Sequence, residues 1–410
     1  MSGPVFVIGG AQSDFARNLG KEGRGLVELT HDTIHAGLQQ ARLDVDAIES
    51  IHVGNAFGEL FTGQAQLGAM PATAVPALWG VPAMRHEGAC ASGSLAVLAA
   101  MSEIEAGRYD CVLVLGLEQE RNVPGDVAAR YMGAAAHAGH EGLEARFLWP
   151  AMFARIAEVY AERHGLRHEH LAAIARKNFT NAASNPLAQT RTWRFSDASF
   201  TADDVANPVV EGRLRRQDCS QVTDGAVAVV LASARFAAAQ AARTGQRMTD
   251  FGRISGWGHR TVGLSLAAKL ERTSEGHLFP HIREAAMDAY RRANIPGPAA
   301  LSGIETHDCF TISEYMAIDH LGITEAGEGW RAIEAGTLER GGALPMNASG
   351  GLIGGGHPVG ATGVRMLLDA HKQVTDSAGD CQISGADRLL TFNLGGSTTT
   401  SVCLIVEAGA

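Results

Sequence analysis

The chain has 410 residues, 46% of them hydrophobic, and a formal net charge of -10 at pH 7. This mildly acidic balance gives no reason to expect nucleic acid or an anionic membrane as a partner. No apolar stretch reaches the roughly 20 residues of a membrane span, and no signal peptide precedes the strand-like residues 5–8, so we expect a cytoplasmic protein without membrane contact.

Strand-like apolar runs alternate with helical segments in the first part of the chain. Strands are predicted at 5–8, 50–53 and 111–115, with helices at 25–42 and directly after Cys90. The run from Thr223 to Leu231 predicts a further buried strand. This alternation favours an α/β fold with a largely parallel sheet.

Residues 118–217 have a different character from the flanking sequence. They are richer in charged, aromatic and polar residues, and Pro150, Pro186 and Pro208 separate short helical pieces. We therefore predict an inserted, partly helical loop domain over this segment.

The strand and helix pattern begins again near residue 279. It predicts helices at 282–293 and 360–371 and strands at 302–306, 388–393 and 401–407. The order of elements in this half echoes that of the first half, as in a duplication. The predicted domains are therefore 1–117 together with 218–265, the loop domain 118–217, and 266–410.

Cys90 is the first candidate for a reactive residue. It lies in the sequence Glu-Gly-Ala-Cys-Ala-Ser-Gly-Ser at 87–94, ahead of the apolar helical run 95–101. A helix N-terminus favours the thiolate over the thiol, so we expect a lowered pKa and a nucleophile. The alternative is a buried cysteine that packs as a small hydrophobic residue.

Two later segments offer further titratable groups. His307 and Cys309 lie in Glu-Thr-His-Asp-Cys-Phe at 305–310, and His357 ends the glycine-rich run that begins at Asn347. Histidine exchanges protons near neutral pH, so both histidines are candidates for acid–base chemistry. The alternative for each is a hydrogen-bonded structural histidine. The spacing of Gly354–Gly356 fits neither the dinucleotide fingerprint nor the Walker motif.

Taken together, these motifs resemble those of the thiolases, and most closely those of the sterol-carrier-protein-type thiolases. The resemblance runs through the Cys90 loop, Thr223–Ala226, Asn347–Pro358 and Phe392–Gly396. Biosynthetic and degradative thiolases have Asn-Glu-Ala-Phe at the position of His307–Phe310, and Cys-x-Gly at the position of Asn393–Gly395. The sterol-carrier type shows the exchange seen here, with the second cysteine at position 309.

This resemblance implies a fold of two similar βαβαβαββ halves, packed in αβαβα layers, with an inserted loop domain. It also implies an acyltransferase that condenses or thiolytically cleaves acyl-CoA thioesters, most simply an acetyl-CoA acetyltransferase. Coenzyme A thioesters are then substrates, and no bound cofactor or metal is expected.

The resemblance also implies a role for each candidate residue. Cys90 would carry the acyl group, His357 would accept its proton, and Cys309 would act as acid and base at the α-carbon of the second thioester. His307 and His357 would stabilise the enolate, and the backbone N–H groups of Cys90 and Gly395 would hold the tetrahedral oxyanion.

Weaker signals concern the binding of the substrate. Arg213, Arg215 and Arg216 form a basic patch suited to the phosphates of CoA, although a solvated turn explains them as well. Met152, with Trp149 and Phe153, could line a tunnel for the pantetheine arm or pack within the loop domain.

Family members are dimers or tetramers, so a homodimer or homotetramer is implied, and some relatives assemble with a small zinc-bearing OB-fold partner. Three alternatives to a thiolase remain. The chain could transfer an acetyl group to a non-CoA acceptor such as an aromatic ring, cleave steroid side-chain CoA esters as a retro-aldolase, or bind acyl-CoA or lipid without catalysis.

Overall fold

A computed structural model describes residues 3–273 and 276–409. Nine strands form one sheet in the order β3-β2-β4-β7-β1-β8-β11-β10-β9. The strands of its first part are β1 (Val5–Gln12), β2 (Ser50–Gly54), β3 (Ala83–His86), β4 (Cys111–Glu118) and β7 (Gly225–Ser233). Those of its second part are β8 (Gly252–Thr261), β9 (Gly303–Thr306), β10 (Arg388–Gly395) and β11 (Thr400–Ala408).

The sheet is mixed, so the expected largely parallel arrangement is wrong. Only β3-β2-β4 and β9-β10 pair in parallel. The pairs β4-β7, β7-β1, β1-β8, β8-β11 and β11-β10 are antiparallel. Strands β10 and β11 are joined by only four residues, and so short a connection permits an antiparallel pair alone.

The two parts of the sheet have the same internal order. The parts meet at β1 and β8. Counted outward from there, the first part has the order β1-β7-β4-β2-β3 and the second part the order β8-β11-β10-β9. In the second part an isolated parallel bridge between Ile304 and Met346 takes the place of a fifth strand. β1 and β8 meet antiparallel through Val5–Val7 and Gly252–Ile254. The predicted fold of two similar halves is confirmed.

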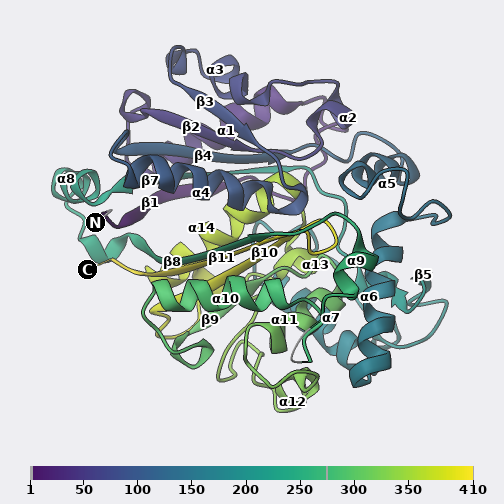
Figure 1. Ribbon diagram of the computed structural model, residues 1–410. Helices are drawn as coiled ribbons and strands as arrows, with labels where there is room; N and C mark the ends of the chain where they lie inside the picture. The colour runs from purple at the N-terminus through teal and green to yellow at the C-terminus, as the bar shows by residue number, and fades with distance from the viewer. Residues whose placement is uncertain (1–2, 274–275, 410) are drawn as a thin grey trace.

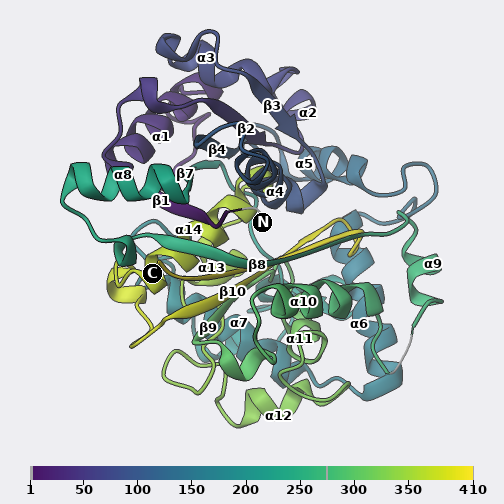
Figure 2. The same ribbon diagram turned by 60° about the vertical axis from the view of Figure 1, so that its left-hand side comes forward.

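Helices and the two parts of the sheet form five layers (Figures 1 and 2). Helices α1 (Leu26–Ala41), α3 (Met70–Ala74) and α8 (Ala234–Thr244) cover the outer face of the first half. Helices α4 (Ser92–Glu105) and α14 (Thr362–Val374) lie between the halves, and α10 (Pro280–Arg292) and α11 (Thr311–His320) cover the second half.

The alternation of side chains along each strand builds the separate cores of these layers. In β4, Leu113 and Leu115 belong to the outer core with α1, whereas Val112 and Val114 belong to the central core with α4 and α14. Successive strand residues face opposite sides of a sheet, and both sides are covered here, so the strands are apolar throughout.

The segment predicted as a loop domain contains α5 (Gly125–Met132), α6 (Leu148–His164), α7 (His168–Ala182) and a short hairpin of β5 (Val209–Glu211) and β6 (Leu214–Arg215). It packs against the second half, where the rings of Tyr160 on α6 and Tyr315 on α11 meet edge to face. The predicted domain boundaries stay a prediction.

The remaining short helices are α2 (Gly58–Thr62), α9 (Leu266–Leu270), α12 (Gly329–Glu334) and α13 (Gly351–Gly355). Across residues 3–273 and 276–409, no helix is both long enough and apolar enough to span a membrane.

The central helices α4 and α14 touch backbone to backbone. A Cβ on Gly93 would lie 2.8 Å from the carbonyl oxygen of Gly360, and a Cβ on Gly363 would lie 2.3 Å from the backbone nitrogen of Ser94. Glycine at these two positions therefore brings the N-termini of both helices together, and with them the loops that precede each helix.

Candidate active site

The Cys90 loop ends in a one-turn 3₁₀ helix, Ala89–Ala91, that leads directly into α4. Ala89 has a φ of 51°, an uncommon left-handed conformation for a residue with a side chain. Its N–H donates to Glu87 Oε1 at 2.6 Å, and its carbonyl accepts from Ser92 Oγ at 2.6 Å. These bonds hold the strained turn that presents Cys90.

His357 lies in the loop ahead of α14, two residues before the 3₁₀ turn Val359–Ala361, and Gly360 in that turn holds the position equivalent to Cys90. Its backbone N–H donates to Thr223 Oγ1 at 2.8 Å. Its ring Nδ1 lies 2.7 Å from Thr362 Oγ1, and that hydroxyl donates to the carbonyl of Pro358 at 3.0 Å. The first turn of α14 therefore fixes both the backbone and the ring of His357.

Cys309 and His307 come from the loop between β9 and α11. The sulfur of Cys309 lies 3.6 Å from Ser313 Oγ, and its carbonyl accepts the N–H of Ser220 at 2.9 Å. His307 Nδ1 lies 3.0 Å from Asn393 Nδ2 at the end of β10. Both residues are buried, with exposed fractions of 5% and 1%.

The structure brings the four predicted catalytic residues to one place. Cys90, Cys309 and His357 line a single cavity of about 270 Å³. The sulfur of Cys90 and one ring nitrogen each of His307 and His357 all lie within 4.8 Å of one another. The two imidazole rings meet edge to face, with 5.4 Å between their centroids.

The hydrogen bonds place the ring protons of the two histidines on opposite nitrogens. The hydroxyl of Thr362 gives its only proton to Pro358, so His357 Nδ1 must donate, and its Nε2 keeps a lone pair. Ser94 Oγ donates to Asn393 Oδ1 at 2.8 Å, so the Asn393 amide nitrogen donates to His307 Nδ1. His307 therefore carries its proton on Nε2. One ring is a proton acceptor and the other is a donor.

Burial keeps the reactive groups neutral when no substrate is bound. It raises the pKa of Cys90 to about 12, and the nearby carboxyl of Glu120 acts in the same direction. Backbone N–H groups of Gly396 and of Cys90 itself direct hydrogen bonds at the sulfur and lower the pKa, but burial outweighs them. The expectation of a lowered Cys90 pKa is wrong because the helix N-terminus acts within a desolvated pocket.

The other reactive groups are also held neutral. Burial, followed by the charge of Arg365, lowers the pKa of His357 to about 3. Burial and the neighbouring His357 hold the pKa of His307 well below its usual value. The pKa of Cys309 is raised well above that of an ordinary thiol, again by burial first.

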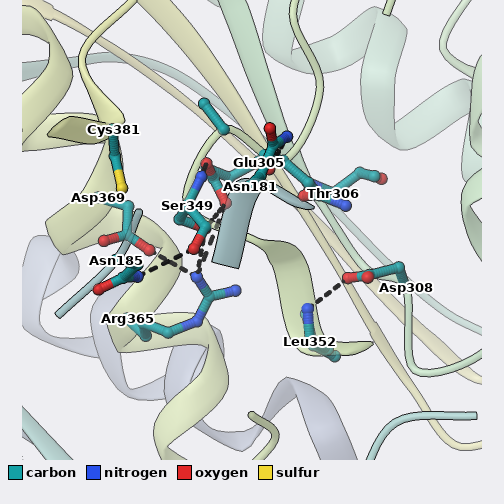
Figure 3. Close-up of polar contacts among 12 residues, drawn as sticks. Asn181, Asn185, Glu305, Thr306, Asp308, Ser349, Leu352, Arg365, Asp369 and Cys381 are labelled. Carbon is teal, nitrogen blue, oxygen red and sulfur yellow. Dashed lines mark hydrogen bonds and ion pairs between the residues drawn. The ribbon is translucent and has the colours of Figure 1, made fainter. Parts of the chain in front are cut away.

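A buried arginine supports the loops behind the site (Figure 3). Arg365 on α14 is 1% exposed, donates to Ser349 Oγ at 2.9 Å and pairs with Asp369 at 2.5 Å. Asp308 accepts the N–H of Leu352 at 2.6 Å, so the loop carrying Cys309 is tied to α13. These contacts connect the His307–Cys309 loop to the glycine-rich loop that ends at His357.

Other predicted residues lie at the edge of the site or away from it. A Cβ on Gly395 would meet the carbonyl oxygen of Gly88 at 2.1 Å, so Gly395 lets β10 approach the Cys90 loop, while the next residue, Gly396, lines the cavity. Met152 lies on a different cavity, although Trp149 and Phe153 line that of Cys90.

The three predicted arginines do not line the Cys90 cavity. Arg213 donates to the carbonyl of Leu166 at 3.3 Å. Arg215 donates to Asp204 Oδ1 and to the carbonyl of Asn207, both at 2.8 Å. Arg216 borders a separate cavity. Contact of these residues with CoA phosphates stays a prediction.

Two residues of the cavity wall were not singled out from the sequence. Cys219 adds a third thiol, and Glu120 adds a carboxyl group that is 1% exposed. An acidic residue that follows a strand is typical of a solvated loop, so the pattern around Glu120 gave no sign of burial.

Comparison with known proteins adds the family context. Two family models match the chain: Thiolase, N-terminal domain, over residues 5–235, and Thiolase C-terminal domain-like, over residues 268–408. An acetyl-CoA acetyltransferase of Methanothermobacter thermautotrophicus is 31% identical over 410 aligned residues, which cover 97% of each chain. Sterol carrier protein 2 of Homo sapiens is 28% identical, over 95% of this chain and 70% of that protein.

Solved structures show the same fold. The Ltp2-ChsH2(DUF35) aldolase matches with a TM-score of 0.77 and 21% identity, over 99% of this chain and 98% of that chain. Human mitochondrial 3-ketoacyl-CoA thiolase in complex with CoA matches with a TM-score of 0.69 and 16% identity, over 100% and 98%.

Proposed function

The chain belongs to the thiolase family, and from this membership we propose that it is an acyl-CoA acyltransferase whose reaction passes through an acyl group on Cys90. The sequence resemblance to the sterol-carrier-protein type agrees with the match to sterol carrier protein 2. The observation that carries the proposal is the shared cavity of Cys90, Cys309 and His357.

The first step is transfer of the acyl group from CoA to the enzyme. The proton of the Cys90 thiol passes to the free Nε2 of His357, and the sulfur attacks the carbonyl carbon of the thioester. The oxyanion is held by the N–H of Cys90 and by those of the Gly395–Gly396 turn. Collapse breaks the carbon–sulfur bond to CoA, and His357 returns its proton to the leaving thiolate.

In the second step, carbon–carbon bond formation uses Cys309. Cys309 first gives its proton to Nε2 of His357, and the thiolate so formed removes the α-proton of a second acyl-CoA. His307 Nε2–H donates to the enolate oxygen. The enolate carbon then attacks the acyl carbon on Cys90. The carbon–sulfur bond to Cys90 breaks, the released sulfur takes the proton from His357, and a 3-oxoacyl-CoA is complete. In the thiolytic direction, the Cys309 thiol protonates the same carbon, a task that suits the raised pKa of this thiol.

The decisive experiment measures the intact mass of the protein after incubation with acetyl-CoA, and then the formation of acetoacetyl-CoA. The unmodified chain is expected to gain one acetyl group on Cys90 and to form product. C90A should gain none, whereas C309A should still be acetylated but lose at least about 10³-fold in condensation rate.

The same variants distinguish the alternatives. Acetylation of Cys90 without any dependence of turnover on Cys309 would favour transfer to a non-CoA acceptor. Carbon–carbon cleavage that persists in C90A would favour a retro-aldolase. A chain that binds acetyl-CoA but is never acetylated would be a non-catalytic binder.

We further propose that the protein is a homodimer or homotetramer, and that a small zinc-bearing OB-fold protein is an additional subunit. Strand β3 lies at one edge of the sheet, and Met84 on it is 46% exposed. An uncovered edge strand is a ready surface for pairing with another chain. Light scattering of the purified protein should give a mass of at least two chains, and M84K should lower it.

A further inference from the structure

Glu120 is a buried acid in the wall of the Cys90 cavity. It lies two residues beyond the end of β4, and only 1% of its surface is exposed. Within the part of the chain that the structure describes, neither carboxyl oxygen of Glu120 has a hydrogen-bond partner. Buried polar groups are nearly always paired, and an unpaired one costs about 1–3 kcal/mol.

The two neighbouring acids, Glu118 and Asp224, are both hydrogen-bonded. Glu118 accepts from the Asn55 side chain and from the backbone of Ala56, Phe57 and Gly360. Asp224 accepts the backbone N–H groups of Leu19, Glu120 and Arg121. Asp224 thereby fixes the backbone of Glu120. The backbone N–H groups of Thr223 and Val359 act on the Glu120 carboxyl and lower its pKa, but neither reaches it as a full hydrogen bond. The carboxyl oxygens therefore retain the capacity to bind a group from outside the protein.

The surroundings of Glu120 define the group that it would receive. The cavity wall beside it includes Phe57, Ala129, Met132 and Val359, which offer no side-chain hydrogen bonds. Burial and the charges of Glu118 and Asp224 raise the pKa of Glu120 well above its usual value, and this shift favours the protonated carboxyl. A protonated carboxyl both donates and accepts a hydrogen bond, and its natural partner is a neutral oxygen.

Glu120 lies on the side of the cavity where the acyl group is held. The Glu120 carboxyl lies close enough to the Cys90 thiol to raise its pKa, whereas the side chains that raise the pKa of Cys309 are those of Cys90 and Asp308. A group bound by Glu120 therefore belongs to the acyl chain that is attached to Cys90.

We propose that Glu120 is a specificity-determining residue, and that it selects acyl-CoA substrates whose acyl chain carries a hydroxyl or carbonyl oxygen beyond the thioester. This inference rests on the proposed function, because it requires an acyl group on Cys90. An acyl chain with such an oxygen completes the hydrogen bonds of Glu120, whereas an unsubstituted chain leaves the carboxyl unpaired. Sites built to bind a substrate hydroxyl reject the analogue that lacks it.

The test compares matched thioesters that differ by one oxygen: 3-hydroxybutyryl-CoA with butyryl-CoA, and 4-hydroxyvaleryl-CoA with valeryl-CoA. The rate of Cys90 acylation is followed by intact mass. The unmodified protein should be acylated at least about tenfold faster by the hydroxylated member of at least one pair. E120Q, which keeps a donor and an acceptor, should retain much of this preference, and E120L should reverse it.

E105Q is the matched control, because Glu105 at the other end of α4 also has a raised pKa through burial but lies outside the cavity. It should leave the preference unchanged. E120L should also unfold at a higher temperature than the unmodified protein, because it removes a buried unpaired acid.

Equal acylation within both pairs, or an undiminished preference in E120L, would overturn the inference while leaving the proposed function intact. If E120L does not fold, loss of the preference to below twofold in E120Q would equally overturn it, because an amide of the same shape retains hydrogen bonding. If acetyl-CoA acetylates Cys90 but none of the four thioesters does, the role of Glu120 fails and the proposed function stands. If acetyl-CoA does not acetylate Cys90 either, the proposed function itself fails, and the role of Glu120 fails with it.

Discussion

Thr362 determines which nitrogen of His357 is free to accept a proton. Its hydroxyl receives the His357 Nδ1 proton because its own proton is given to the carbonyl of Pro358. This arrangement resembles the general case in which a third group orients a catalytic base. It also ties the base to the first turn of α14, so the ring cannot rotate without breaking its hydrogen bond to Thr362.

T362V should therefore slow acylation of Cys90 by about 10- to 100-fold, because the isosteric side chain removes the acceptor that holds the ring. Stopped acylation reactions analysed by intact mass give the rate. T362S keeps the hydroxyl and should stay close to the unmodified rate. Equal rates for the valine and serine variants would show that the hydroxyl does not orient His357.

The raised pKa of Cys90 predicts a steep pH dependence of its reactivity in the free protein. With a pKa of about 12, the thiolate fraction grows about tenfold for each pH unit between 7 and 9. Alkylation of Cys90 by iodoacetamide, followed by peptide mass mapping, should rise at this rate. His357 has a pKa of about 3, so it adds no second ionisation in this range. A plateau that begins below pH 8 would contradict the neutral thiol.

At this scale, the sequence identified Cys90, His307, Cys309 and His357 because each lies in a distinctive motif. It could not show that burial outweighs the helix N-terminus at Cys90, since desolvation depends on residues from several distant loops. Glu120 was missed for the same reason: a charged residue reveals nothing of its burial until the wall around it is assembled.

Helices α4 and α14 meet through glycines, and this contact places the two reactive loops. A Cβ on Gly363 would lie 2.3 Å from the Ser94 backbone nitrogen and 2.7 Å from Asn393 Oδ1. Ser94 and Asn393 form the hydrogen-bonded chain that orients His307. The packing of α4 against α14 and the orientation of His307 therefore both depend on the absence of a side chain at Gly363.

G363A should destabilise the fold by about 3 kcal/mol, because an inserted methyl group in a close contact forces the backbones apart. It should also slow condensation more than acylation, since His307 is displaced. Thermal unfolding and the two rates measure these effects. G341A is the control, because a Cβ at Gly341 meets nothing within 4 Å. Similar unfolding temperatures for the two variants would contradict the close contact.

Most helices and strands followed from periodicity, because buried strands here are continuous apolar runs and the longer helices begin near small residues. The periodicity of the sequence did not predict whether neighbouring strands pair in parallel or antiparallel. The direction of pairing depends on the lengths and routes of the connections, and the long segment between β4 and β7 conceals that these neighbouring strands run in opposite directions.

The two halves share the central core. Val5, Val112 and Val229 from the first half pack in the same cluster as Val364 and Leu404 from the second. Neither half can bury this surface alone, and the sheet also continues across the junction of β1 and β8. The duplicated halves thus form one cooperative unit.

Residues 1–248 and 249–410, produced separately, should each lack fixed tertiary structure, because each exposes one side of the central core. Near-ultraviolet circular dichroism of the fragments measures this. Produced together in one cell, the fragments should associate and recover acylation of Cys90. A cooperative thermal transition in either isolated fragment would show that the halves fold independently.

At the scale of the molecule, the internal repeat was visible in the sequence only as a recurring order of elements. The structure shows which strands correspond: β1 and β8, β7 and β11, and β4 and β10 hold equivalent places in the two parts of the sheet. Sequence similarity between halves fades more readily than the order of their strands.

Cys90 and His357 come from the loops that precede the two central helices, but Cys90 lies two residues before the start of α4 and His357 five residues before the start of α14. Counted back from the two helices, Gly360 is the match of Cys90, and Glu87 is the match of His357. The likeness of the two halves brings the two loops to one place, but each loop contributes its reactive side chain from a different position, so the site itself has no twofold symmetry.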